Sequence, residues 1–211
     1  MSSLRTVIVE QFGHPAGVVG RIVGLIMTVR SSNRERSRKT LALLDIQPAD
    51  RVLEIGHGPG LALGWAASLA RAGKVVGVDH SQLMHRQAAR HNARALAQGR
   101  VELFVASADA MPDLGAPFDK VFAVNVHLFW KDPPATLARV ARVMRPGATL
   151  ALTFQPRQPG ATAQDALRGG ERMAADLRAA GFHSVRVEIQ KLRPVDGVCV
   201  LGTMPDQLPR M

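Results

Sequence analysis

Short apolar runs recur along this chain, and longer stretches that suit a helix separate them. Apolar runs of about four to eight residues, bounded by glycine, proline or polar turns, are typical of strands. The expected strands cover residues 51–55, 74–79, 100–105, 118–125, 148–154, 184–189 and 195–203. The expected helices cover residues 31–44, 61–70, 81–97, 132–144 and 163–180. This alternation predicts an α/β fold in which a parallel sheet carries helices on both faces.

The first expected strand runs directly into a glycine-rich turn that contains Gly56, Gly58 and Gly60. A helix-compatible stretch begins at the next residue, Leu61. In a strand–glycine turn–helix unit the backbone can approach a bound nucleotide closely, and the helix N–H groups face that ligand. The turn therefore predicts a nucleotide-like ligand, although an ordinary glycine-rich connection would share this pattern.

A carboxylate, Asp79, ends the second expected strand, nineteen residues beyond Gly60. An acid in this place can accept hydrogen bonds from ribose hydroxyls. The alternative role for Asp79 is to cap the helix that follows. Because Ser81 can cap that helix itself, we favour ribose binding.

A dinucleotide dehydrogenase is the first alternative that the glycine turn raises. Its fingerprint requires a third glycine at position 61, where this chain has Leu61. In addition, Glu54 lies two residues before Gly56 and would repel a diphosphate, whereas it would favour a cationic amino acid. Both residues argue against a pyrophosphate-binding site.

Composition sets broader limits on partners. The chain has 211 residues, 46% hydrophobic and 21% charged, which suits one globular domain. The single cysteine, Cys199, excludes an internal disulfide framework and favours a cytoplasmic protein. The net charge of +10 would attract an anionic substrate, a nucleic acid or a membrane surface without selecting among them. Aromatic residues are too few for a stacking surface, so no nucleic acid is expected as a partner.

Taken together, these residues resemble those of class I S-adenosylmethionine-dependent methyltransferases. The resemblance rests on the motif 52–60, on Asp79 at the next strand end and on the segment 142–147 before the fifth strand, and it covers residues 41–203. It is closest to the group that includes the ubiquinone and menaquinone C-methyltransferases and many natural-product methyltransferases. It implies a Rossmann-like, seven-stranded, mostly parallel sheet with helices on both faces and an antiparallel last strand. The implied cofactor is S-adenosylmethionine, which becomes S-adenosylhomocysteine.

The resemblance also implies roles for individual residues around the cofactor. Glu54 would lie near the methionine ammonium, and the loop 56–60, with Gly56, His57, Gly58 and Gly60, would line the methionine and ribose. Asp79 would hold the ribose hydroxyls. Four further residues would surround the adenine: His80, Met84, Ala108 and Asp109.

The end of the fourth strand would face the sulfonium and the acceptor, through Asn125, Val126 and His127. His127 is the best candidate for a general base, because imidazole titrates near neutrality. It can equally serve only to shape the pocket, and His57 is a weaker candidate. Phe129 and Trp130 would form an apolar wall for the acceptor.

Two other kinds of site find little support in the sequence. The tripeptide at 132–134 lacks the aromatic residue that amino-methyltransferases of DNA place after Asp-Pro-Pro, and an Asp cap followed by proline explains it. His80, His85 and His91 are spaced so that one helix face cannot present all three, so no metal is expected.

The N-terminal part contains an apolar segment, 17–27, followed by a basic run, 30–39. It suits a lid over a pocket, and peripheral membrane contact is an alternative. We expect a helical cap over 1–45, an S-adenosylmethionine-binding methyltransferase domain over 46–204 and a frayed tail over 205–211.

The sequence thus predicts a methyltransferase for a small, apolar or partly anionic acceptor. An RNA or protein methyltransferase and a non-catalytic S-adenosylmethionine-binding protein are the alternatives. The sequence does not identify the methylated atom or the oligomeric state.

Overall fold

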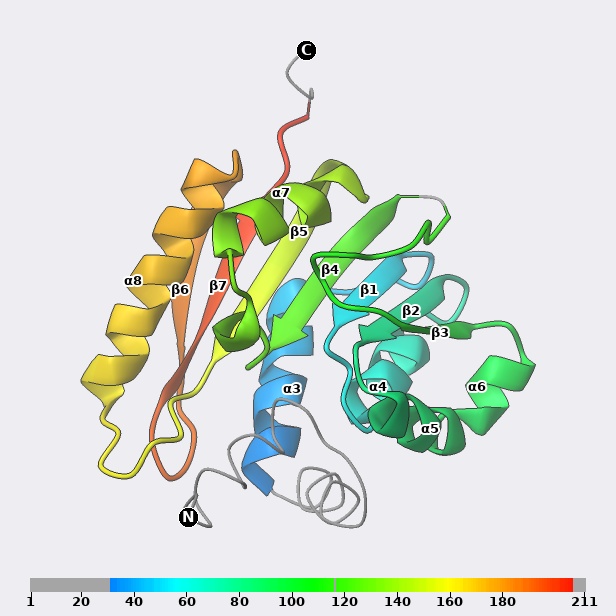
Figure 1. The fold of residues 1–211 in the computed structure, drawn as a ribbon, viewed down its shortest axis with the longest axis horizontal. Helices are drawn as coiled ribbons and strands as arrows, with labels where there is room; N and C mark the ends of the chain where they lie inside the picture. Colours follow the sequence, from blue (N-terminus) through cyan, green and yellow to red (C-terminus); the bar gives the residue numbers. More distant parts are fainter. Residues whose placement is uncertain (1–30, 116, 207–211) are drawn as a thin grey trace.

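The computed structural model describes residues 31–115 and 117–206, and within them seven strands form one sheet in the order β3-β2-β1-β4-β5-β7-β6 (Figure 1). The strands are β1 (Arg51–Ile55), β2 (Lys74–Asp79), β3 (Val101–Val105), β4 (Phe118–Val124), β5 (Met144–Phe154), β6 (His183–Gln190) and β7 (Gly197–Thr203). Neighbouring strands from β3 to β5 are parallel, and β7 is antiparallel to both β5 and β6. The predicted sheet is therefore confirmed, including its antiparallel last strand.

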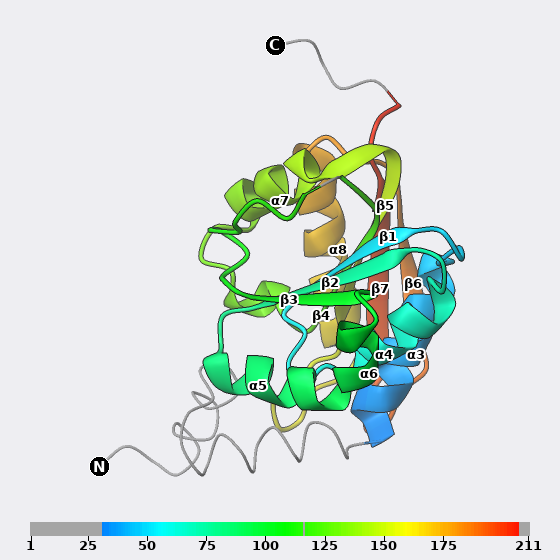
Figure 2. The ribbon, with the colours of Figure 1, turned by 90° about the vertical axis from the view of Figure 1, so that its right-hand side faces the viewer.

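Helices cover both faces of this sheet (Figure 2). The helices are α3 (Ser31–Leu44), α4 (Leu61–Leu69), α5 (Gln82–His91), α6 (Ala93–Ala97), the 3-10 helix η1 (His127–Phe129), α7 (Pro133–Arg142) and α8 (Ala163–Ala179). Figure 2 shows α3, α4 and α6 on one side of the sheet and α7 and α8 on the other.

Two buried clusters follow from this layering. On the side of α3 and α4, Val52 and Phe122 pack with Leu44. On the side of α7 and α8, Leu53 and Val121 belong to the other cluster. Successive strand residues point to opposite faces, so a strand covered on both faces is apolar throughout, as the central run of β4 is.

The structure divides the helix that we predicted over residues 81–97. α5 ends at His91, α6 begins at Ala93, and Asn92 lies between them. The side-chain amide of Asn92 donates to the carbonyl oxygens of Ala88 (2.9 Å) and Gly60 (2.8 Å). The Asn92 side chain thus bonds to backbone from the break between the helices, a role that suits asparagine better than a helix interior.

The start of the fifth strand also differs from the prediction. α7 ends at Arg142, two residues early, and β5 begins at Met144 instead of Ala148. Phe118 pairs with Met144, whereas Lys120 pairs with Thr149, so the intervening residues of β5 form an irregular bulge. Gly147 adopts a φ of 73° within it. Pro146 and Gly147 are accommodated by this bulge.

Within the described residues no helix is long and apolar enough to cross a membrane. The apolar segment 17–27 and most of the predicted cap lie outside the described residues. The division of the chain at residue 45 stays a prediction, as does the frayed tail.

Candidate active site

The glycine loop between β1 and α4 lies against the end of β4. Gly56 has a φ of 71°, and its N–H donates to the Val78 carbonyl at 2.7 Å. A β-carbon built on Gly56 would lie 2.3 Å from Cγ2 of Val126. Only glycine allows this approach, because a side chain would meet both the left-handed backbone and Val126. The loop and residue 126, predicted separately, are therefore brought together.

The C-terminal end of α5 supports the other end of the loop. Asn92 donates to the Gly60 carbonyl, and Nδ1 of His91 lies 2.9 Å from the Pro59 carbonyl oxygen. A β-carbon on Gly60 would lie 2.6 Å from Cβ of Ala88. Reasoning from the sequence missed His91 and Asn92 as loop supports, because nothing in a helix-like stretch indicates contact with a turn 32 residues earlier.

Asp79 lies at the centre of the site. One carboxylate oxygen accepts from the Gly58 amide (2.9 Å), and the other accepts from the Ser81 amide (2.8 Å). The Ser81 hydroxyl oxygen accepts from the Met84 amide and so caps α5. Ser81, and not Asp79, is thus the side-chain cap of α5. This favours ribose binding as the role of Asp79. Its carboxylate has about four acceptor positions, and two backbone bonds leave room for ligand hydroxyls.

Of the remaining candidates around the adenine, His80 and Met84 follow Asp79 along the chain, and Ala108 and Asp109 follow β3, the strand beside β2. Nδ1 of His80 is 3.8 Å from Oδ1 of Asp79, and Met84 is buried. The Ala106 amide donates to the Asp79 carbonyl, which holds the start of the 106–109 loop beside β2. Asp109 is exposed, and its hydrogen bond with Ser107 lowers the pKa of its carboxyl.

Glu54 is a buried acid on β1, with 4% of its surface exposed. Its Oε2 has no hydrogen-bond partner among the described residues. Burial, followed by the negative charge of Asp79, raises the pKa of Glu54 well above its usual value, and a backbone hydrogen bond from Leu63 offsets this only in part. A buried carboxylate in this position is unfavourable unless a cation accompanies it. A cationic ligand group beside Glu54 would supply that charge.

His57 is buried in the glycine loop. Its Nδ1 lies 2.7 Å from the Gly58 carbonyl, and because a carbonyl can only accept, Nδ1 carries the proton. Burial lowers the pKa of His57, so the ring is neutral and Nε2 is an acceptor. Within the described part of the chain Nε2 has no partner.

His127 packs edge-on against two aromatic rings. Its ring centroid lies 5.7 Å from that of Phe154 and 6.4 Å from that of Trp130. Burial, and then the charge of Arg172, lowers the pKa of His127 to about 4. Our expectation that this imidazole titrates near neutrality was wrong, because burial and the nearby charge of Arg172 both disfavour the protonated ring. At physiological pH His127 is a neutral hydrogen-bonding group and a weak base.

The turn that carries His127 exposes apolar surface next to the loop. Leu128 and Phe129 are 53% and 52% exposed, whereas Trp130 is partly buried. In the described structure Nδ1 of His127 and Nε1 of Trp130 are buried without partners. This turn thus combines an apolar surface with two available polar atoms.

Asn125 links the ends of two strands. It adopts a φ of 57°, a left-handed conformation that asparagine tolerates better than most residues. Its side chain accepts from the Gln155 amide (2.8 Å) and donates to the Gln155 carbonyl (3.1 Å). Gln155 was not among the site residues that we predicted from the sequence.

No group of three or more His, Cys, Asp or Glu side chains in the described residues is arranged to hold a metal ion.

Comparisons with known proteins agree with this geometry. A family model described as "Methyltransferase domain" matches residues 52–147. The uncharacterized methyltransferase YdaC of Bacillus subtilis is 30% identical over 184 residues, which cover 87% of this chain and 98% of that protein. Nocamycin O-methyltransferase of Saccharothrix syringae is 35% identical over 122 residues, 57% of this chain and 43% of that protein.

Among solved structures, an S-adenosylmethionine-dependent methyltransferase from Aquifex aeolicus superposes with a TM-score of 0.66. The two chains are 21% identical, and the match covers 83% of this chain and 94% of the other, so it shows a shared fold. The family match, the full-length relative and the sheet order lead to one conclusion: the chain belongs to the class I S-adenosylmethionine-dependent methyltransferases and is an enzyme.

Proposed function

We propose that this methyltransferase acts on a small acceptor that is apolar or partly anionic, within the ubiquinone and menaquinone C-methyltransferase-like and natural-product group. When bound, S-adenosylmethionine supplies an electrophilic methyl group on a sulfonium. The protein has to hold the cofactor, align the acceptor for an in-line displacement and exclude water.

The observation that carries the cofactor assignment is the pair of acids around the glycine loop. Glu54 is buried with an oxygen that lacks a partner among the described residues, and Asp79 is held by two backbone amides. The ammonium of a methionine moiety would compensate the charge of Glu54, and ribose hydroxyls would donate to Asp79. The residues present therefore fit this cofactor.

The other assignments follow from their neighbours. The backbone of 56–60 would line the methionine and ribose, with His57 Nε2 as a further acceptor. His80, Met84, Ala108 and Asp109 would surround the adenine. Asn125 would act through its backbone, since its side chain is bonded to Gln155.

The exposed turn after β4 supports a small acceptor. Val126 contacts the glycine loop, and the next residues of the turn expose Leu128 and Phe129. An apolar acceptor would pack on this surface beside the methyl group, with Trp130 behind it. In this arrangement His127 orients a polar group of the acceptor as a hydrogen-bond acceptor, and strong base catalysis is not expected of it. The relative named for O-methylation favours oxygen as the methylated atom.

The test is calorimetric titration of the full chain with S-adenosylmethionine, S-adenosylhomocysteine and NAD. We expect micromolar binding of both sulfur ligands, weakened at least about tenfold in Asp79→Asn, because one ribose hydroxyl would lose a charged acceptor. Asp45→Asn is the matched control, since Asp45 is exposed and its positive φ also suits asparagine. Tight NAD binding without a response to either sulfur ligand would overturn the proposal.

With the cofactor established, turnover is measured on mixtures of small hydroxylated acceptors, on RNA and on protein. Methylation confined to RNA or protein would replace the small-acceptor proposal. Cofactor binding without turnover on any of them would favour a binding protein that acts through a partner.

A further inference from the structure

A buried arginine lies at the carboxyl end of β5. Arg36, on α3, is only 5% exposed, and its Nη1 donates to Oε1 of Gln155 at 2.7 Å. Among the described residues, no carboxylate forms an ion pair with Arg36. Burial, and then the charge of Arg157, lowers the pKa of Arg36 to about 9. A buried guanidinium is costly without an anionic partner, so its surroundings call for one.

A second guanidinium converges on the same point. Nη2 of Arg36 donates to Oδ1 of Asn33 at 3.1 Å, and Nη2 of Arg157 donates to the same oxygen. Two cationic forks therefore meet at one neutral amide oxygen. A carboxylate matches such forks better, because it carries a charge and two acceptor oxygens in one plane.

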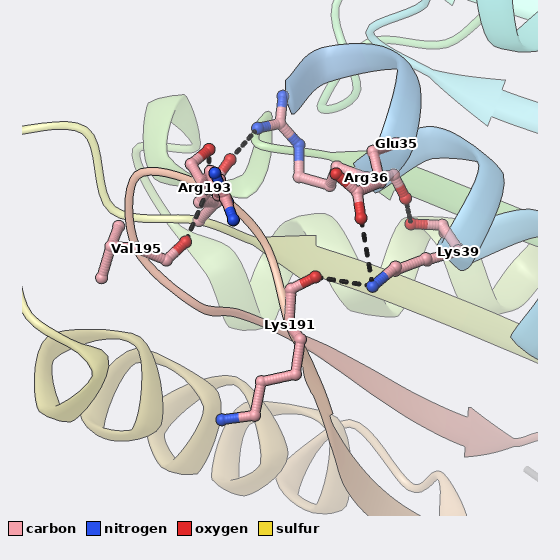
Figure 3. A network of polar contacts seen from close by, with 8 residues as sticks. Glu35, Arg36, Lys39, Lys191, Arg193 and Val195 are labelled. Atoms are coloured by element: carbon pink, nitrogen blue, oxygen red, sulfur yellow. Dashed lines mark hydrogen bonds and ion pairs between the residues drawn. The ribbon is translucent and has the colours of Figure 1, made fainter. Parts of the chain in front are cut away.

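The other groups around the Arg36 side chain are polar, and one buried polar atom there lacks a hydrogen-bond partner among the described residues. Gln155 uses its amide nitrogen to donate to the carbonyl oxygens of Arg193 (3.2 Å) and Val195 (2.8 Å), both drawn in Figure 3 opposite Arg36. Nε of Arg36 is buried and has no partner in the described part of the chain. Buried polar atoms left this way are usually bonded to a ligand or to ordered water.

Two hydrogen-bonded steps connect this place to the candidate active site. The Gln155 side chain accepts from Arg36, and its backbone exchanges hydrogen bonds with the Asn125 side chain. Asn125 precedes Val126, which contacts Gly56. The arginines therefore lie at the carboxyl ends of the strands, where open α/β sheets bind ligands.

We propose that Arg36 and Arg157 form an oxyanion subsite that binds a carboxylate group of the acceptor. The acceptor would bridge from this subsite to the apolar turn at 126–129, so its anionic end would fix which atom faces the methyl group. This inference rests on the proposed function and narrows its acceptor class to small carboxylic acids. A phosphate ester offers the same oxyanion chemistry and forms a second arm of the test.

The experiment uses the full chain saturated with S-adenosylhomocysteine. Benzoate, phenyl phosphate, acetate and the neutral analogue benzamide are titrated by calorimetry at constant ionic strength. Arg36→Gln and Arg157→Gln remove one charge each, Arg36→Lys keeps the charge without the fork, and Arg34→Gln is the control on the exposed face of the same helix. Binding of S-adenosylhomocysteine and the melting temperature are measured first for every variant.

We expect millimolar or tighter binding of benzoate and acetate, with no binding of benzamide. Benzoate affinity should fall at least about tenfold in Arg36→Gln and Arg157→Gln, less in Arg36→Lys, and not at all in Arg34→Gln. Binding of phenyl phosphate alone would replace the carboxylate with a phosphate ester.

Equal affinity for benzoate and benzamide, or no anion binding by protein that binds S-adenosylhomocysteine normally, would overturn the subsite and leave the proposed function intact. If the unmodified protein does not bind S-adenosylhomocysteine, the proposed function fails and the subsite fails with it. Because Arg157 is exposed, Arg157→Gln keeps the test decisive if Arg36→Gln does not fold.

Discussion

The side chain of Asn125 and the backbone of Gln155 exchange two hydrogen bonds, of 2.8 and 3.1 Å. Each residue lies just beyond its strand, so the pair holds the ends of β4 and β5 together where regular pairing stops. Since Arg36 bonds to the Gln155 side chain, α3 is fixed to the same point. The position of the turn 126–129, on which we propose that the acceptor packs, therefore depends on Gln155, a residue that need not touch the acceptor.

Replacement of Asn125 separates the effect of its two hydrogen bonds to Gln155 from the effect of its left-handed backbone conformation. Asn125→Ala should lower the free energy of unfolding by about 2–4 kcal/mol, because two backbone groups lose partners and alanine is strained at φ 57°. Asn125→Gly loses the same bonds without that strain and should be about 1 kcal/mol more stable than the alanine variant. Urea unfolding measures both. Wild-type stability in both variants would mean that the Gln155 bonds contribute nothing.

Gly56→Ala tests the approach of the loop to β4. The added carbon meets Val126 at 2.3 Å in addition to the strain of a positive φ. Gly99→Ala is the matched control, since Gly99 has a φ of 67° and no atom within 4 Å of the added carbon. The control should lose about 1–2 kcal/mol of unfolding free energy, and Gly56→Ala should lose about 1–3 kcal/mol more. Similar losses in the two variants would contradict the close contact.

Glu54→Gln should affect the free and the cofactor-bound protein in opposite directions. The pKa of Glu54 is raised in the folded protein, so its ionisation opposes folding above its ordinary pKa. Glutamine removes this cost, and the free protein should gain about 1 kcal/mol at pH 7. Binding of S-adenosylmethionine should weaken at least about tenfold, because the ammonium loses its counter-charge.

Thermal melts of Glu54→Gln with and without the cofactor show both effects. A lower melting temperature for the free variant, together with unchanged cofactor affinity, would place Glu54 outside the cofactor site.

The stability of the protein should depend on His127 below neutral pH. Its pKa is about 4 in the folded protein and about 6.5 when unfolded, so the unfolded chain binds more protons between these values. The contribution is therefore fully present above about pH 6.5 and decreases as the pH falls towards 4. His127→Phe should remove about 2–3 kcal/mol of the stability difference between pH 7 and pH 4. Parallel pH profiles of variant and wild type in urea unfolding would show that another group is responsible.

The reading from sequence succeeded where neighbouring residues along the chain determine the structure. The strand–glycine–helix unit, the acid at the end of β2 and the Asp132 cap of α7 all depend on residues within a few positions, and the structure confirms these elements. Prediction from the sequence failed where residues far apart in the chain determine the local structure. Asn92 interrupts a helix because it bonds to Gly60, and the bulge in β5 depends on its pairing with β4.

The candidate anion subsite could not be predicted for the same reason. Arg36 and Gln155 are 119 residues apart, and only the packing of α3 across the sheet brings them together. In the sequence Arg36 is one of many arginines, and its burial distinguishes it from the exposed Arg34 of the same helix. The burial that lowers the pKa of His127 likewise involves distant residues, since Phe154 of β5 packs on its ring and the charge of Arg172 comes from α8.

The place of β7 between β5 and β6 has a consequence for the order of assembly. β7 is the last of the described strands to leave the ribosome, yet it pairs with β5 from Thr149 to Phe154. Until residues 197–203 have been synthesised, β5 presents an open edge of backbone N–H and C=O groups to other chains. Newly made chains are thus most prone to aggregate during this interval, and insertion of β7 ends it.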